Sequence, residues 1–190
     1  MIEEKLEIPT LGAEVNLYRP DRLADYPGIV FITDVWGVRP ANIGMARRLA
    51  EKGFAVLVPN AFHRYSRNRA EGFMPKDEGE KTKVLYELFA ALTPQQMDSD
   101  SKAYVDFLTA QTHVKAGKVG VVGHCYTGQM AVRMAALMAD RIAAAASLTS
   151  AMGSAGVGVA SGVLAQPASS PSTARAHTSD SARFTEGPSL

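Results

Sequence analysis

Apolar strand-like runs alternate with helical segments along most of this chain, and that alternation is the feature that most restricts its fold. Three runs rich in apolar and β-branched residues, at positions 27–33, 54–58 and 118–123, are each bounded by turn-forming residues. Such runs are typical of strands covered on both faces, as in parallel sheets. Strands joined by helices favour right-handed crossovers. The sequence therefore predicts a doubly wound, mostly parallel α/β sheet with helices on both faces.

The other elements follow from the spacing of apolar residues and from turn residues at their ends. They are an opening hairpin of strands 2–8 and 13–18, a helix ending at Gly53, helices at 78–92, 95–112 and 128–139, and a strand at 141–148. Residues 59–77 carry Arg64, Arg67 and Arg69 and show little periodicity. We expect them to form a solvated basic loop or a lid.

The composition changes after Leu148. Of the 42 residues that follow, 29 are Ser, Ala, Gly, Thr or Pro, which leaves too few large apolar side chains to support more sheet. We therefore expect an incomplete domain at residues 1–148, with its C-terminal strands missing, and a low-complexity, disordered tail at residues 149–190. A truncation or an altered reading frame near residue 148 is one hypothesis for this change, and a natural tail on a degenerate domain is the other.

Charge and cysteine content exclude several classes of function. Twenty Lys and Arg against nineteen Asp and Glu give a net charge of +1, so no sequence-wide field attracts nucleic acid or anionic membranes. A single cysteine, Cys125, excludes an internal disulfide framework and a multi-thiolate metal site. No segment has the pattern of a signal peptide or the apolar length of a membrane helix. We expect a cytoplasmic protein with no nucleic acid or membrane partner.

The candidate chemistry lies in residues 123–128, GHCYTG, directly after a predicted buried strand and before a predicted helix. A nucleophile on such a tight turn projects above the sheet, and the next backbone N–H faces a developing oxyanion. A helix N-terminus also favours a thiolate. The alternative for Cys125 is a buried structural cysteine. A phosphate-binding loop is disfavoured, because Gln129 and Met130 replace its Lys and its Ser or Thr.

On these motifs the chain resembles the dienelactone hydrolase family, a branch of the α/β-hydrolase fold with a Cys-His-Asp triad. Three stretches in the family's order carry the resemblance over about residues 2–148. The Gly-x-Cys-x-Gly-Gly elbow resembles residues 123–128, the acidic-apolar-aromatic-Gly strand end resembles residues 33–37, and the Pro-Asp-Leu-aromatic-x-Arg stretch resembles residues 59–64. The resemblance implies that Cys125 is the nucleophile of a small-ester or lactone hydrolase that needs no cofactor or metal.

The resemblance also implies roles for other residues. The backbone N–H groups of Val35 and Tyr126 would form the oxyanion hole. Asp34 stands in place of the family's usual Glu and would interact with the resting thiol, gating its reactivity. A strand-end turn carboxylate is the alternative role for Asp34. Trp36 would line the substrate site, and Arg64 is a candidate contact for an anionic substrate.

The chain departs from the family pattern at several positions. Thr127 replaces the first glycine of the Gly-Gly pair, where a β-branched residue is expected to strain or reshape the elbow, and Asn60 replaces the usual Asp. In this fold the triad acid and then the histidine follow the nucleophile, but the tail offers only His177 and Asp180, in reversed order. The other histidines are expected to be structural or solvated, without metal-ligand spacing: His63, His113 and His124.

The sequence therefore predicts a hydrolase of small esters or lactones that acts through Cys125, and it does not identify the triad Asp and His. Two alternatives remain open. One is a catalytically incomplete domain that binds a ligand or partner, or that self-associates through an exposed sheet edge. The other is a redox-sensing thiol at Cys125. The oligomeric state is not predicted.

Overall fold

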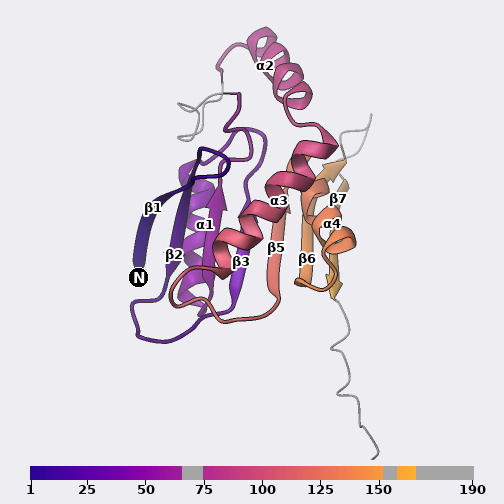
Figure 1. The fold of residues 1–190 in the computed structure, drawn as a ribbon. Coiled ribbons are helices and arrows are strands. Elements are labelled where there is room, and N and C mark those ends of the chain that lie inside the picture. The colour runs from indigo at the N-terminus through magenta and orange to yellow at the C-terminus, as the bar shows by residue number, and fades with distance from the viewer. Residues whose placement is uncertain (66–74, 152–157, 166–190) are drawn as a thin grey trace, which may run out of the picture.

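The strands form one mixed sheet. The computed structural model describes residues 1–65, 75–151 and 158–165. The seven strands are β1 (Ile2–Ile8), β2 (Ala13–Arg19), β3 (Gly28–Ile32), β4 (Ala55–Pro59), β5 (Val119–His124), β6 (Ile142–Ala151) and β7 (Gly158–Ala165). Their order in the sheet is β1-β2-β4-β3-β5-β6-β7 (Figure 1). The central strands β4, β3, β5 and β6 pair in parallel, and the other pairs are antiparallel.

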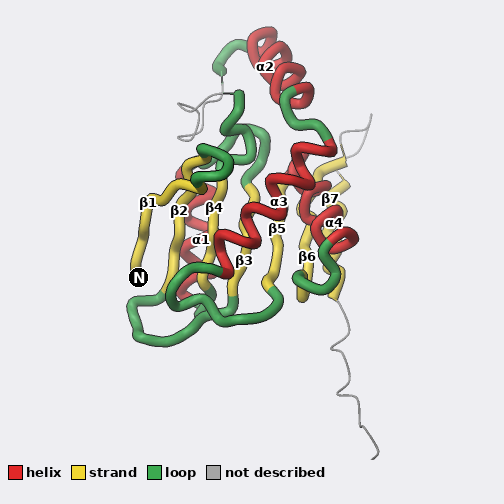
Figure 2. The backbone as a smooth tube through the Cα atoms, viewed as in Figure 1, coloured by secondary structure: helices red, strands yellow, loops and turns green. Residues whose placement is uncertain are grey.

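Helices cover both faces of this sheet. They are α1 (Pro40–Glu51), α2 (Glu78–Ala90), α3 (Pro94–Thr109) and α4 (Gly128–Leu137). Ala46 and Ala50 of α1 pack with Phe31 and Val56 on one face, whereas α3 and α4 pack on the other (Figure 1). Helix α2 lies beyond the end of the sheet (Figure 2). This arrangement confirms the predicted α/β sheet with helices on both faces.

The ends of the helices follow local chemistry. Thr93 caps α3: its hydroxyl accepts from the Gln96 N–H at 3.3 Å, and the Gln96 side chain accepts from the Thr93 N–H at 2.8 Å. Asp77 caps α2 by accepting from the Glu80 N–H at 2.9 Å. The bonds at both helix ends satisfy amide groups that have no partner inside the helix. None of the helices in the described ranges is both long and apolar enough to cross a membrane.

The sheet continues past residue 148. Strand β6 runs to Ala151, and β7 pairs with it along the whole ladder from Ala144↔Ala165 to Ala151↔Gly158. The expectation that no further strand follows Leu148 was therefore wrong. An antiparallel edge strand is held by main-chain hydrogen bonds and needs fewer large apolar side chains than a central strand. Disorder of the tail beyond β7 stays a prediction, because residues 166–190 lie outside the described residues.

Candidate active site

The backbone at Cys125 is strained. The residue begins a short 3₁₀ turn, Cys125–Thr127, between β5 and α4, and its φ is +54°. This left-handed conformation costs a non-glycine residue about 1–2 kcal/mol. A Cβ at Gly123 would lie 2.6 Å from the Thr127 carbonyl oxygen and 2.9 Å from the Gly128 Cα. Strand and helix therefore approach too closely for a side chain at Gly123, and both features are typical of a nucleophile elbow.

The segment after β3 lies beside this elbow. Strands β3 and β5 pair in parallel, and their ladder ends with Ile32 opposite Gly123. Since parallel strands end at the same edge of a sheet, residues 33–37 and the elbow emerge side by side. Cys125 is partly buried, and its thiol is not in a disulfide. The structure thus brings together the segments that carry the predicted nucleophile and the predicted oxyanion hole.

Thr127 joins the two segments through its side chain. Its hydroxyl donates to the Thr33 carbonyl at 2.6 Å and lies 2.9 Å from the His124 carbonyl oxygen. Thr127 is fully buried, and its own backbone is helical, with φ −77° and ψ −4°. The strain of the elbow therefore falls on Cys125 rather than on Thr127.

Asp34 shapes the turn that follows β3. One carboxylate oxygen accepts from the Trp36 N–H at 2.9 Å, and the other forms an ion pair with Arg39. The Asp34 carbonyl accepts from the Gly37 N–H at 3.1 Å. Within the described residues, no hydrogen bond joins the carboxylate to Cys125. The geometry is that of the turn carboxylate, and the contact of Asp34 with the resting thiol stays a prediction.

Three more residues that the sequence predicts at the site belong to these two segments: Val35, Trp36 and Tyr126. Val35 is 4% exposed, and the part of the chain that the structure describes provides no hydrogen-bond acceptor for its N–H. The Tyr126 ring packs against Phe89 of α2, with centroids 4.2 Å apart. Trp36 is partly buried against the main core. Helix α2 therefore packs against the elbow through Phe89 and Tyr126, and the role of Trp36 in the substrate site stays a prediction.

Arg64, the predicted contact for an anionic substrate, is paired within the protein. Its guanidinium makes two hydrogen bonds, of 2.5 and 2.6 Å, to the carboxylate of Asp100 on α3. The Asp100 side chain is fully buried, and that of Arg64 is 36% exposed. These bonds raise the pKa of Arg64 and hold its charge against α3. Arg67 and Arg69 lie outside the described residues.

The same loop carries other buried polar groups. The Asn60 side chain accepts from the Phe62 N–H at 3.1 Å, so Asn60 forms the turn after β4. The His63 Nδ1 donates to the Asn60 carbonyl at 3.2 Å, since a carbonyl oxygen only accepts. Burial lowers the pKa of His63, and the Asp100 carboxylate opposes that shift. Burial also raises the pKa of Tyr104, which follows Asp100 by one helical turn on α3.

Among the described residues, no hydrogen bond joins a histidine ring to Cys125. His63 bonds to Asn60, His124 to the Ile32 carbonyl at 3.1 Å, and the His113 carbonyl accepts from the Tyr26 N–H just before β3 begins. His177 and Asp180 lie outside the described residues. Within the described ranges, no three His, Cys, Asp or Glu side chains are placed to hold a metal ion.

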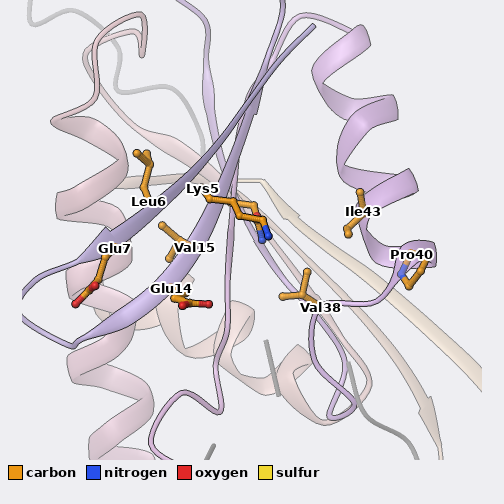
Figure 3. A pocket seen from close by; sticks show the side chains of 9 residues that line it. Lys5, Leu6, Glu7, Glu14, Val15, Val38, Pro40 and Ile43 are labelled. Carbon is orange, nitrogen blue, oxygen red and sulfur yellow. The ribbon is translucent and has the colours of Figure 1, made fainter. Parts of the chain in front are cut away.

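A groove of about 680 Å³ lies apart from the elbow. Figure 3 shows Lys5 and Glu14 on the side of the hairpin and Val38, Pro40 and Ile43 on the side of α1. Its lining includes none of the elbow residues. The groove therefore does not form the site around Cys125.

Sequence reasoning missed Arg39 and Asp100, the partners of the two predicted charged residues. A signal existed for Asp100, because it shares a helical stripe with the buried Met97, Tyr104 and Leu108. An acidic residue on such an apolar stripe indicates a buried ion pair. No comparable signal marked Arg39.

Several known proteins are similar to this chain. The profile of the Dienelactone hydrolase family matches residues 13–158. Protein usf of Aquifex pyrophilus is 30% identical over 143 residues, which are 73% of this chain and 58% of that protein. The carboxymethylenebutenolidase of Rhodococcus opacus is 30% identical over 118 residues, 61% of this chain and 41% of that enzyme. The chain thus spans about half the length of the curated relatives that it matches.

Solved structures show the same fold. The crystal structure of a dienelactone hydrolase-like promiscuous phosphotriesterase from metagenomic libraries matches with a TM-score of 0.57 at 21% identity. The match covers 73% of this chain and 54% of the other. The sheet order and the helices on both faces are therefore those of an α/β-hydrolase-like fold, as predicted.

Proposed function

This chain belongs to the dienelactone hydrolase family, and we propose that it hydrolyses small esters or lactones through a thiolate at Cys125. The observation that carries the proposal is the elbow backbone, where φ of +54° at Cys125 follows a strand and precedes a helix. A strained nucleophile at that point is the geometry that acyl transfer uses. The name of the Rhodococcus opacus relative, carboxymethylenebutenolidase, supports a small lactone as the substrate class.

The proposed reaction has two steps. The Cys125 thiolate attacks the carbonyl carbon, and the electron pair of the C=O bond moves to its oxygen. The N–H groups of Val35 and Tyr126 stabilise that oxyanion, and each such donor contributes about 10²–10³ in rate. When the carbonyl re-forms, the C–O bond of the ester breaks, the alkoxide leaves and takes a proton from water, and a thioester remains on Cys125. The hydroxide formed from that water attacks the thioester carbonyl, the C–S bond breaks, and the acid leaves as Cys125 returns to the thiolate.

Other residues support this chemistry. In the proposal Asp34 holds the turn that presents the Val35 N–H, through its bond to the Trp36 N–H. Trp36 forms a wall of the substrate site. A contact between Arg64 and an anionic substrate requires the exposed part of the guanidinium, since two of its hydrogen bonds go to Asp100. No cofactor takes part in these steps.

The test is acylation of Cys125 by p-nitrophenyl acetate, followed by p-nitrophenol release and by intact mass. We expect one acetyl group on the wild-type chain and none on Cys125→Ala. Because no hydrogen bond joins a described histidine ring to Cys125, we expect acylation to be faster than deacylation, with a burst of about one equivalent. Equal p-nitrophenol release by wild type and Cys125→Ala would refute the proposal. Cys125→Ser is the matched control for the fold of the elbow.

A further inference from the structure

We propose that Thr127 is a positioning residue that sets the distance between the two N–H groups of the oxyanion hole. Its hydroxyl would do so by tying the elbow to the end of β3. This inference rests on the proposed hydrolase function and deepens it.

The first observation is where the sheet ladder stops. Main-chain pairing between β3 and β5 ends at Ile32↔Gly123, before either segment of the proposed hole begins. Beyond that point two side chains continue the connection. The Thr127 hydroxyl donates to the Thr33 carbonyl at 2.6 Å, and the His124 Nδ1 donates to the Ile32 carbonyl at 3.1 Å. The residue before Cys125 and the second residue after it thus bind two successive carbonyls. One belongs to Ile32, the last residue of β3, and the other to Thr33, the next residue.

The second observation is how close this connection lies to the proposed donors. Thr127 directly follows Tyr126, and Thr33 stands two residues before Val35. Thr33 and Thr127 are both fully buried, so water does not compete for this hydrogen bond. This hydrogen bond holds together the two segments that follow β3 and β5, beyond the point where main-chain pairing ends.

The hydrogen bond between Thr127 and Thr33 is expected to affect the rate of acylation because the donors of an oxyanion hole must be held at short distances. An oxyanion hole acts only when its donors stand 2.7–3.1 Å from the developing charge, and a misplacement of about 1 Å can cost a factor of about 100. The Val35 side keeps a second constraint in the turn at Asp34, and the Tyr126 side keeps its packing on Phe89. Loss of the hydroxyl therefore loosens the link between the donors without removing either donor.

The test compares Thr127→Val with Thr127→Ser, using the rate of Cys125 acetylation by p-nitrophenyl acetate measured by intact mass. For Thr127→Val we expect the limiting acylation rate to fall about tenfold with the half-saturating concentration unchanged. Thr127→Ser keeps the hydroxyl and should restore the rate to within about twofold. Thr109→Val is the matched control, because its hydroxyl donates to the Val105 carbonyl at 2.8 Å within α3, and its rate should not change.

A second measurement does not depend on turnover. Amide hydrogen exchange in peptides containing Val35 and Tyr126 should be faster in Thr127→Val than in wild type, and unchanged in Thr109→Val. If Thr127→Val does not fold, Thr127→Gly also lacks the hydroxyl and should show the same losses. Unchanged acylation and unchanged exchange in the variant without the hydroxyl overturn the inference. Absence of acylation in the wild type overturns the proposed function instead, and the exchange result alone then decides the role of Thr127.

Discussion

The elbow after β5 and the loop after β4 leave the same edge of the sheet, but they differ in backbone strain and in how their reactive or charged side chains are paired. The elbow after β5 holds Cys125 in a strained conformation with a partly buried thiol. Residues 60–65, which begin the loop after β4, contain no residue with a left-handed backbone, and the charged group there, Arg64, is paired with the buried Asp100. Strain beside a nucleophilic group is typical of a functional site, whereas a paired buried charge has a structural role. This difference supports the proposal that the chemistry takes place at the elbow, and it indicates a structural role for Arg64 in the β4 loop.

The largest loss of stability is expected from adding a side chain at Gly123, where strand β5 and helix α4 are in close contact. Gly123→Ala places a Cβ 2.6 Å from the Thr127 carbonyl oxygen, and main chain cannot move aside cheaply. We expect a loss of about 3 kcal/mol in the free energy of unfolding, measured with urea. Gly44→Ala is the control, because its Cβ would meet only the Arg48 guanidinium at 3.7 Å. Gly44→Ala should raise the free energy of unfolding by about 0.5–1 kcal/mol, because alanine favours a helix more than glycine does. A wild-type stability for Gly123→Ala would contradict the close strand–helix approach.

The next effect tests the β4 loop. Asp100→Ala leaves the Arg64 guanidinium without its partner, and we expect a loss of about 2–3 kcal/mol, below that of a fully buried pair because Arg64 is 36% exposed. Asp98→Ala removes a similar pair with Arg133, whose side chains are 36% and 37% exposed. It should cost less than about 1 kcal/mol. Equal losses in the two variants would show that burial does not distinguish the β4 loop from the surface.

A smaller effect is expected at Asp34, on the elbow side. Because its carboxylate already bonds to the Trp36 N–H and to Arg39, Asp34→Asn keeps the turn and removes only the charge. We expect the rate of Cys125 alkylation by iodoacetamide to change by a factor of about five at most. A larger increase would show that the charge acts on the thiol, as the sequence resemblance implies. Asp34→Ala also loses the turn acceptor and should cost about 1 kcal/mol of stability.

The sequence predicts those parts of the fold that depend on residues close together in the chain. The β-branched runs at β3, β4 and β5 and the elbow at Cys125 are local patterns, and each appears where its pattern predicts. Strand β7 was missed, because an edge strand needs little apolar side chain. The pair of Arg64 with Asp100 was also missed, because the fold brings together residues 36 positions apart. Local periodicity places Asp100 on the buried face of α3, but it does not identify Arg64 as the partner.

The smallest predicted effect is a pH dependence that arises in the β4 loop. Burial lowers the pKa of His63 below its ordinary value of 6.5, and the opposing effect of the Asp100 carboxylate is smaller. Below pH 6.5 the unfolded chain therefore binds a proton that the folded chain does not. The contribution of His63 to stability is complete above pH 6.5 and is lost as the pH falls, with a slope of at most about 1.4 kcal/mol per pH unit.

Urea unfolding at a series of pH values from 8 to 5.5 measures this slope. His63→Asn should flatten it, because the substituted side chain does not titrate. His113→Asn is the matched control, since His113 has a φ of +67° and Asn tolerates that left-handed conformation. If the His113 variant loses the slope and the His63 variant keeps it, the acid sensitivity belongs to the turn before β5. The β4 loop would then have no buried neutral histidine, and its contrast with the elbow would depend on Arg64 and Asp100 alone.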